Sequence, residues 1–102
     1  MTQVMRMFQT AIDPVDVDAL RRLFSEDVLP VYTQLPGCLG MELFISVQSS
    51  AGGLVEGAAV SRWSNLEEME KAIGSRPVAE AQVRILQLLR QEPVIRVFEV
   101  LA

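Results

Sequence analysis

Residues 39–63, LGMELFISVQSSAGGLVEGAAVSRW, decide the fold of this chain. Two apolar runs, 39–48 and 54–63, flank a short segment of serine, alanine and glycine that has the composition of a turn. Neither run alternates strictly between apolar and polar residues, as a strand with one face in water would. The stretch therefore predicts a hairpin of two strands whose faces are both covered.

The segment before the hairpin predicts a strand and then a long helix. Residues 4–12 (VMRMFQTAI) are mostly apolar on both alternating faces, which indicates another covered strand. Asp13 and Pro14 are residue types that begin helices, and apolar residues then recur every three or four positions as far as Leu35. Pro30 lies inside this pattern, so we expect a kink or a break there.

The segment after the hairpin predicts two helices and a last strand. Residues 64–67 (SNLE) match a capping box, in which Ser64 caps the first helix. A second helix is expected over 78–91, because Pro93 follows it, and a strand is expected over 94–101.

This order of elements is β-α-β-β-α-β, with the second helical part split in two, and it defines an α+β fold of the ferredoxin-like type. It implies a four-stranded antiparallel sheet with helices on one face, in a single domain over residues 1–102. Because the strands are apolar on both faces, the face without helices needs a cover as well. The same face of a second copy is the simplest cover, so we expect a homodimer.

Composition excludes several classes of function. The 102 residues carry a net charge of −4 without a basic stripe, so nucleic acid is not an expected partner. No run approaches the ~20 apolar residues of a membrane span, and the N-terminus lacks the pattern of a signal peptide. Cys38 is the only cysteine, which precludes an internal disulfide and fits a reducing compartment. A cytoplasmic protein is therefore expected.

The chain contains no histidine. Zinc sites of cysteine and histidine, haem bound by a proximal histidine, and nucleophilic sites with a histidine base are therefore excluded. The sequence has no dinucleotide-binding G-x-G-x-x-G motif and no cluster of metal ligands. We expect no cofactor and no metal.

Two segments resemble a known family. The helix-to-strand junction at 35–40 (LPGCLG) and the strand end with a tryptophan at 61–69 (SRWSNLEEM) are similar to those of antibiotic biosynthesis monooxygenases. The order and length of the elements resemble that family over nearly the whole chain. The resemblance implies a dimeric α+β barrel, in which two sheets face each other and a ligand pocket lies between each sheet and its own helices. Related proteins include cofactor-independent quinol-forming oxygenases, haem-degrading enzymes and small-lactone isomerases.

The chain departs from the haem-degrading pattern in two places. Those proteins carry an asparagine on the first strand and an iron-binding histidine in the second helical region, whereas this chain has Gln9 and no histidine. Haem breakdown is therefore not expected. The tryptophan of the family is retained as Trp63.

Seven residues are candidates for a site in the implied pocket. Trp63, at a strand end, could orient a flat aromatic substrate, although packing is the alternative. Arg76 could stabilise charge that develops on a substrate, and Gln9 could donate a hydrogen bond to a substrate carbonyl. These three are the candidate catalytic residues. The candidate substrate-binding residues are Tyr32, Arg62, Met41 and Phe8.

The charged candidates have structural alternatives. Arg62 and Arg76 could form solvated ion pairs with nearby glutamates. Arg6 and Arg96 lie in apolar strands, where buried charges should pair across the sheet or the dimer interface. Their expected partners are the strand glutamates, one of which could instead act as a general base with a raised pKa: Glu42, Glu56 and Glu99.

The resemblance and the candidate residues together predict a cofactor-independent monooxygenase. It would oxidise a small aromatic or phenolic substrate, such as a quinol or an anthrone, with O₂ in an apolar pocket between sheet and helices. The substrate would supply the electrons, and a carboxylate or the substrate's own acidity would replace a histidine base. Two alternatives stay open: a non-catalytic dimer that binds a small hydrophobic molecule, and an isomerase of the muconolactone type.

Overall fold

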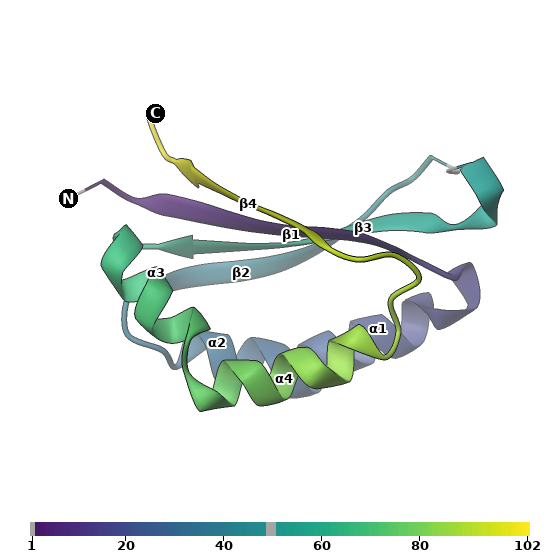
Figure 1. The fold of residues 1–102 in the computed structure, drawn as a ribbon, viewed down its shortest axis with the longest axis horizontal. Helices are drawn as coiled ribbons and strands as arrows, with labels where there is room; N and C mark the ends of the chain where they lie inside the picture. Colours follow the sequence, from purple (N-terminus) through teal and green to yellow (C-terminus); the bar gives the residue numbers. More distant parts are fainter. Residues whose placement is uncertain (1, 49–50) are drawn as a thin grey trace.

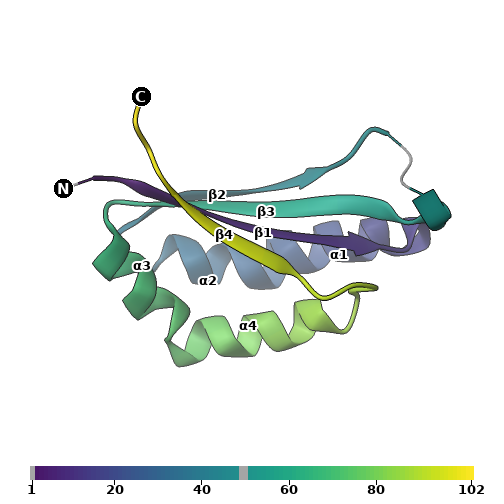
Figure 2. The same ribbon diagram turned by 45° about the horizontal axis from the view of Figure 1, so that its top comes forward.

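The sheet and the helices form two layers. In the computed structural model, which describes residues 2–48 and 51–102, the strands form one antiparallel sheet in the order β2-β3-β1-β4. The helices lie on one face of this sheet (Figure 1), and the opposite face, called the open face below, has no cover from the described residues (Figure 2). The strands are β1 (Val4–Ile12), β2 (Cys38–Ile45), β3 (Val55–Trp63) and β4 (Val94–Glu99). This arrangement confirms the predicted ferredoxin-like α+β fold, whereas the dimeric barrel stays a prediction.

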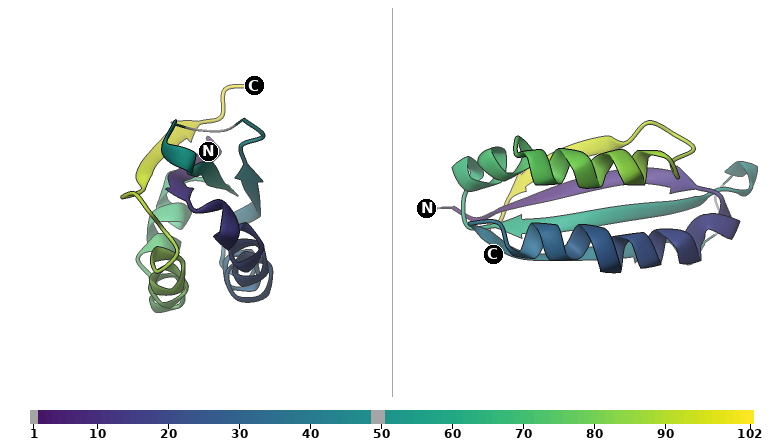
Figure 3. Two further views of the ribbon diagram at one scale, coloured as in Figure 1. Left: turned by 90° about the vertical axis from the view of Figure 1, so that its right-hand side faces the viewer. Right: turned by 90° about the horizontal axis from the view of Figure 1, so that it is seen from below.

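The helical layer consists of two columns that run along the strands in opposite directions (Figure 3). The first column contains the 3₁₀ turn η1 (Pro14–Asp16), α1 (Val17–Leu23), the π-helical turn η2 (Phe24–Val28) and α2 (Leu29–Thr33). The second contains α3 (Leu66–Ile73) and α4 (Arg76–Leu86). None of the helices in the described part of the chain is long and apolar enough to cross a membrane.

The central strand β1 determines which residues face the helices. Val4, Arg6 and Phe8 point toward the helical layer and are buried there, whereas the residues between them point to the open face. β3 pairs with β1 so that Trp63 lies opposite Val4 and Ser61 lies opposite Arg6. Because directly paired residues share a face, Ser61 and Trp63 also face the helices.

The first helical column shows how Pro30 is accommodated. The column begins as predicted, because the Asp13 side chain accepts a hydrogen bond from the Val15 N–H at 3.0 Å. The predicted break takes the form of the π-helical turn η2 directly before α2, where the Leu29 N–H donates to the Phe24 carbonyl. A regular helix would set the proline ring against the carbonyl four residues earlier, and the wider turn relieves that conflict.

Gly37 forms the junction between the first helical column and β2. Its φ of +83° lies in the left-handed region, and a β-carbon at this position would lie 2.5 Å from Cβ of Glu68. The Gly37 carbonyl accepts a hydrogen bond from the Ser64 N–H at 2.8 Å, which ties the junction to the start of α3. The backbone conformation and the close approach of α3 therefore both require glycine.

The cap of α3 lies one residue later than predicted. The Asn65 side chain accepts a hydrogen bond from the Glu68 N–H at 2.9 Å and caps the helix, so the prediction of Ser64 as the cap is wrong. Ser64 is held outside the helix because its N–H donates to the Gly37 carbonyl. The tertiary contact thus moves the start of the helix by one position.

The second helical column ends earlier than predicted. The helix expected over 78–91 stops at Leu86, because the residues after it pair with the end of β1: the Arg90 N–H donates to the Ala11 carbonyl at 3.0 Å. β2 and β4 also end slightly before their predicted last residues. Of the turn predicted in the hairpin, residues 49 and 50 lie outside the described part of the chain.

The open face of the sheet is largely apolar. Phe44 on β2 and Val94 and Phe98 on β4 are between 46% and 49% exposed there. The strand register also places four charged side chains on this face, and they balance in charge: Glu42, Glu56, Arg62 and Arg96. The strands therefore have one face covered by helices and one apolar face without a cover.

Candidate functional site

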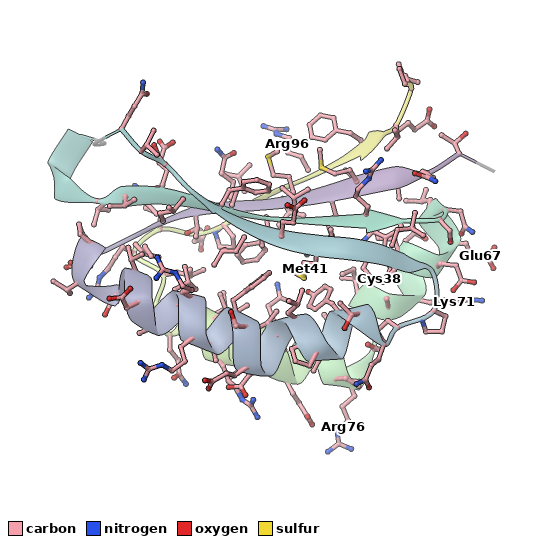
Figure 4. The ribbon with its side chains drawn as sticks, turned by 180° about the vertical axis from the view of Figure 1, so that it is seen from behind. Cys38, Met41, Glu67, Lys71, Arg76 and Arg96 are labelled. Atoms are coloured by element: carbon pink, nitrogen blue, oxygen red, sulfur yellow. The ribbon has the colours of Figure 1, made fainter. Side chains whose placement is uncertain are left out.

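A small apolar cavity lies between the sheet and the helical layer. Its walls come from both layers and include Phe8 of β1, Met41 of β2, Tyr32 of α2 and Ile85 of α4. Figure 4 shows Met41 between the sheet and the helices. The small residues 57–59 of β3 leave the space open on the sheet side. The cavity volume is about 30 Å³, which is room for about one or two water molecules.

A larger groove adjoins this cavity beside the edge strand β2. The groove lies between β2 and the first helical column and has a volume of about 350 Å³. Four side chains line both spaces and separate them: Leu20, Phe24, Met41 and Leu43. The groove has the size of a small-molecule site, whereas the cavity alone does not.

Arg6 is the charged group in the cavity wall. Its side chain lines the cavity although the residue is only 5% exposed. Among the described residues no carboxylate forms an ion pair with it. Its guanidinium carbon lies 5.9 Å from the centre of the Phe8 ring, and the guanidinium lies within hydrogen-bonding reach of the Tyr32 hydroxyl. Arg6 is thus a buried cation whose neighbours are neutral.

Tyr32 and Gln82 add hydrogen-bonding groups to the same cavity. Burial raises the pKa of Tyr32 above its usual value of 10.0, and the opposing effects of the Arg6 charge and hydrogen bond are smaller. The phenol is therefore neutral near pH 7 and can donate a hydrogen bond. Gln82 of α4 brings an amide to the wall, whereas the Thr10 hydroxyl is already bonded to the Gln91 carbonyl at 3.0 Å.

Trp63 lies behind Tyr32 and outside the cavity wall. The residue is fully buried, and its indole N–H donates to the Ser61 hydroxyl at 2.9 Å. The rings of Trp63 and Tyr32 are 6.3 Å apart and tilted by 56°. Trp63 therefore packs against a cavity residue and restricts the position of its ring.

Comparison with other proteins identifies the fold. No family model and no curated protein matches the sequence. Rv0793 from Mycobacterium tuberculosis aligns with a TM-score of 0.71 and 21% identity, over 98% of this chain and 96% of that one. A structure described as an antibiotic biosynthesis monooxygenase aligns with a TM-score of 0.71 and 18% identity, over 97% and 99% of the two chains. SnoaB, a cofactor-independent oxygenase from Streptomyces nogalater, aligns with a TM-score of 0.76 and 10% identity, over 98% and 94%.

This chain has the antibiotic biosynthesis monooxygenase fold. The likeness confirms, at the level of the fold, the resemblance that the sequence indicated at residues 35–40 and 61–69. In this chain, three of the candidate residues lie together: Phe8, Tyr32 and Met41 all line the cavity.

Three other candidates lie away from the cavity. Gln9 and Arg62 each neighbour an inward-facing residue of a strand, and consecutive strand residues point to opposite faces, so both lie on the open face. Arg76 opens α4 and points into solvent (Figure 4), where its Nε lies 3.1 Å from Oε1 of Glu80. Its side chain is 90% exposed.

Arg6 is the cavity residue that the sequence analysis did not select. The expected ion pair across the sheet is not formed within the described residues, because Glu42 and Glu56 lie on the open face and Glu99 lies at the exposed edge. The signal was present in the sequence, since a period of two puts Arg6 on the same face as Val4 and Phe8.

Proposed function

We propose that this protein is a cofactor-independent monooxygenase that oxidises a small aromatic or phenolic substrate with O₂. The observation that carries this proposal is the apolar cavity with its adjoining groove, lined by Phe8, Tyr32 and Met41. It lies between sheet and helices on a fold shared with SnoaB, which is described as a cofactor-independent oxygenase.

Such a reaction takes its electrons from the substrate. When an aromatic methylene becomes a carbonyl, one atom of O₂ becomes the carbonyl oxygen and the other leaves as water with the two hydrogens. The two C–H bonds supply the four electrons that reduce O₂. The protein then has to bind the carbanion beside O₂ and keep other water away, which an apolar space with a few hydrogen-bond donors can do.

The identity of the residues in the cavity wall restricts the substrate. Neither a histidine nor a carboxylate is among the described residues that line the cavity. A proton released in the cavity therefore passes to the groove, whose lining includes the carboxylate residue Glu42, or to solvent. This favours acidic C–H or O–H compounds such as anthrones, naphthols and hydroquinones. The lack of a base among the described residues of the cavity itself also favours the second candidate, a non-catalytic binder of a small hydrophobic molecule. It disfavours an isomerase, which needs an acid and a base.

Oxygen uptake by the purified protein tests the proposal. We expect one O₂ consumed per substrate molecule oxidised from a panel of anthrones, naphthols and hydroquinones, without any added cofactor. Met41→Trp fills the boundary between groove and cavity and should abolish uptake, whereas Lys71→Ala on the exposed face of α3 should leave it unchanged. Equal uptake by heat-denatured protein, or by Met41→Trp, would contradict the oxygenase. Binding without uptake across the panel would establish the non-catalytic binder.

We also propose that the open face is covered by the same face of a second copy. Its apolar side chains on β2 and β4 are half exposed, as expected for a surface that is buried in an assembly. Its two glutamates and two arginines balance in charge, so two copies can approach without net repulsion. A two-fold axis would place this face against itself.

A further inference from the structure

Among the described residues, Arg6 forms no ion pair, although Glu99 of β4 lies on the same face of the sheet two residues beyond its neighbour Val97. The residues opposite it in the sheet are Ser61 on β3 and Val97 on β4, neither of which carries a charge. The titratable groups on its helix side are the Tyr32 phenol and, beyond it, the Cys38 thiol. Burial raises the pKa of both, so both are neutral near pH 7. The cavity therefore carries a net positive charge.

A buried cation without an ion-pair partner lowers the stability of a protein, so we expect it to have a role in binding or catalysis. Removing a guanidinium from water is costly, and buried arginines are almost always paired with an anion. One neutral phenol does not replace a carboxylate as a partner, because it accepts a hydrogen bond but brings no negative charge to offset the buried guanidinium. We therefore expect the anion to come from outside the described chain. The groove beside β2 shares Met41 and Leu43 with the cavity that Arg6 lines, and its own walls also include Arg21 and Glu42.

We propose that Arg6 is the binding group for an anionic ligand, namely a small aromatic compound that carries a phenolate or a carboxylate. The negative oxygen lies against the Arg6 guanidinium with the Tyr32 hydroxyl as a second donor. The ring occupies the groove against Phe24, Met41 and Leu43. This inference deepens the proposed function and uses the same site.

Binding the anion at Arg6 also explains how the substrate can be ionised in a cavity whose described walls hold no base. A cation beside a phenol stabilises its ionised form, so the pKa of the bound phenol falls below its value in water. The phenol releases its proton to solvent on binding, and the electron-rich anion remains in the apolar space. Arg6 thereby supplies by electrostatics what a histidine would otherwise supply by proton transfer.

A chromophoric ligand tests this inference without any reaction. The neutral and ionised forms of 4-nitrophenol absorb at different wavelengths, so the absorbance of the bound ligand reports its charge. The wild-type chain should bind 4-nitrophenol as the phenolate and lower its pKa, and it should bind the neutral isostere 4-nitrotoluene far more weakly. Arg6→Met should weaken phenolate binding about 10- to 100-fold and abolish the preference over 4-nitrotoluene. A parallel titration with benzoate distinguishes a carboxylate site from a phenolate site.

Two control variants and a stability measurement separate binding from packing. Arg22→Met removes an exposed arginine of α1 and should leave binding unchanged, whereas Arg6→Lys keeps the charge and should keep the preference for the anion. Without ligand, Arg6→Met should be at least as stable as the wild type, because it removes an uncompensated buried charge.

Three outcomes would overturn the assignment of Arg6. They are no binding of either anion to the wild type, equal binding of 4-nitrotoluene and 4-nitrophenol, and an Arg6→Met chain that is less stable than the wild type. Anion binding that depends on Arg6 without any oxygen uptake would remove the monooxygenase and leave this inference intact. Oxygen uptake that Arg6→Met does not change would contradict the role of Arg6 and leave the monooxygenase intact.

Discussion

The hydrogen bond between the Trp63 indole and the Ser61 hydroxyl joins two buried residues on one face of β3. Trp63→Phe leaves the Ser61 hydroxyl without this donor and opens a small void. We expect it to lower the free energy of unfolding by about 3 kcal/mol. Ser61→Ala removes the acceptor and should cost about 1–2 kcal/mol in the wild type, because a buried indole N–H then lacks a partner. Urea denaturation of both variants measures these changes.

A double variant tests the coupling between the two residues. Once Trp63 is phenylalanine, Ser61→Ala should cost close to nothing, since the hydroxyl has already lost the indole N–H as its donor. Strictly additive costs would show that the hydrogen bond contributes nothing to stability. In that case the role of Trp63 would be packing against Tyr32 alone.

Tyr32 makes the stability of the protein depend on pH in the alkaline range. Its folded-state pKa is raised above 10.0, mainly by burial, so folding favours the neutral phenol. This contribution to stability is complete below pH 10 and is lost as the pH rises through the folded-state pKa. Because Tyr32 is the only tyrosine, tyrosinate absorbance measures the titration directly. Arg6→Met should move it to still higher pH, and a titration at pH 10 or below in the folded wild type would contradict the effect of burial.

At the scale of the elements, Gly37 sets the connection between the first helical column and the sheet. Gly37→Ala places a β-carbon in a left-handed conformation and against Glu68, and we expect a loss of stability of about 2 kcal/mol or more. Gly52→Ala is the matched control, because Gly52 also has a positive φ of 82°, and in the described part of the chain no atom beyond its chain neighbours lies within 4 Å of the added carbon. It should cost only about 1–2 kcal/mol. Equal losses in thermal denaturation would show that the contact with α3 does not matter.

The local pattern of the sequence predicts most of the fold. The strand at 4–12, the cap at Asp13 and the break near Pro30 all depend on neighbours in the chain, and the structure has each of them. The predictions are wrong where residues that are distant in sequence take the backbone hydrogen bonds that a local pattern would use. Ser64 loses the cap because its N–H bonds to Gly37, and the second column stops at Leu86 because β1 takes the next residues as partners.

The candidate site is less predictable than the fold. Phe8, Tyr32 and Met41 reach the cavity because large apolar and aromatic side chains on the helix-facing side must point into the space between the layers. Arg6 becomes a candidate binding residue because no carboxylate pairs with it among the described residues of the folded chain, which the sequence alone does not show. A sequence that contains several glutamates in strands suggests partners for this arginine. The register shows that Glu42 and Glu56 lie on the opposite face, and Glu99 forms no ion pair with Arg6 in the described part of the chain.

At the scale of the whole molecule, the open face predicts a dimer. Light scattering should give a molar mass near twice the 11.3 kDa of the chain. Phe98→Glu puts a charge on a side chain that is half exposed in one copy, so it should leave the fold intact and yield monomers. Val83→Glu, at a 57% exposed position on the outer side of α4, should leave the dimer intact. A wild-type mass near 11.3 kDa at micromolar concentration would remove the basis for the dimer.

The strand order β2-β3-β1-β4 has a consequence for how the chain folds during synthesis. β1 leaves the ribosome first of the four strands, yet it lies between β3 and β4, and its Val4 pairs with Trp63 and Glu99. At a synthesis rate of about 5–20 residues per second, several seconds pass between the synthesis of β1 and that of these partner residues. The β2–β3 hairpin can pair in the meantime, because its strands are neighbours in sequence. The apolar strand that carries Arg6 and Phe8 is thus the segment most in need of a chaperone until the last strand emerges.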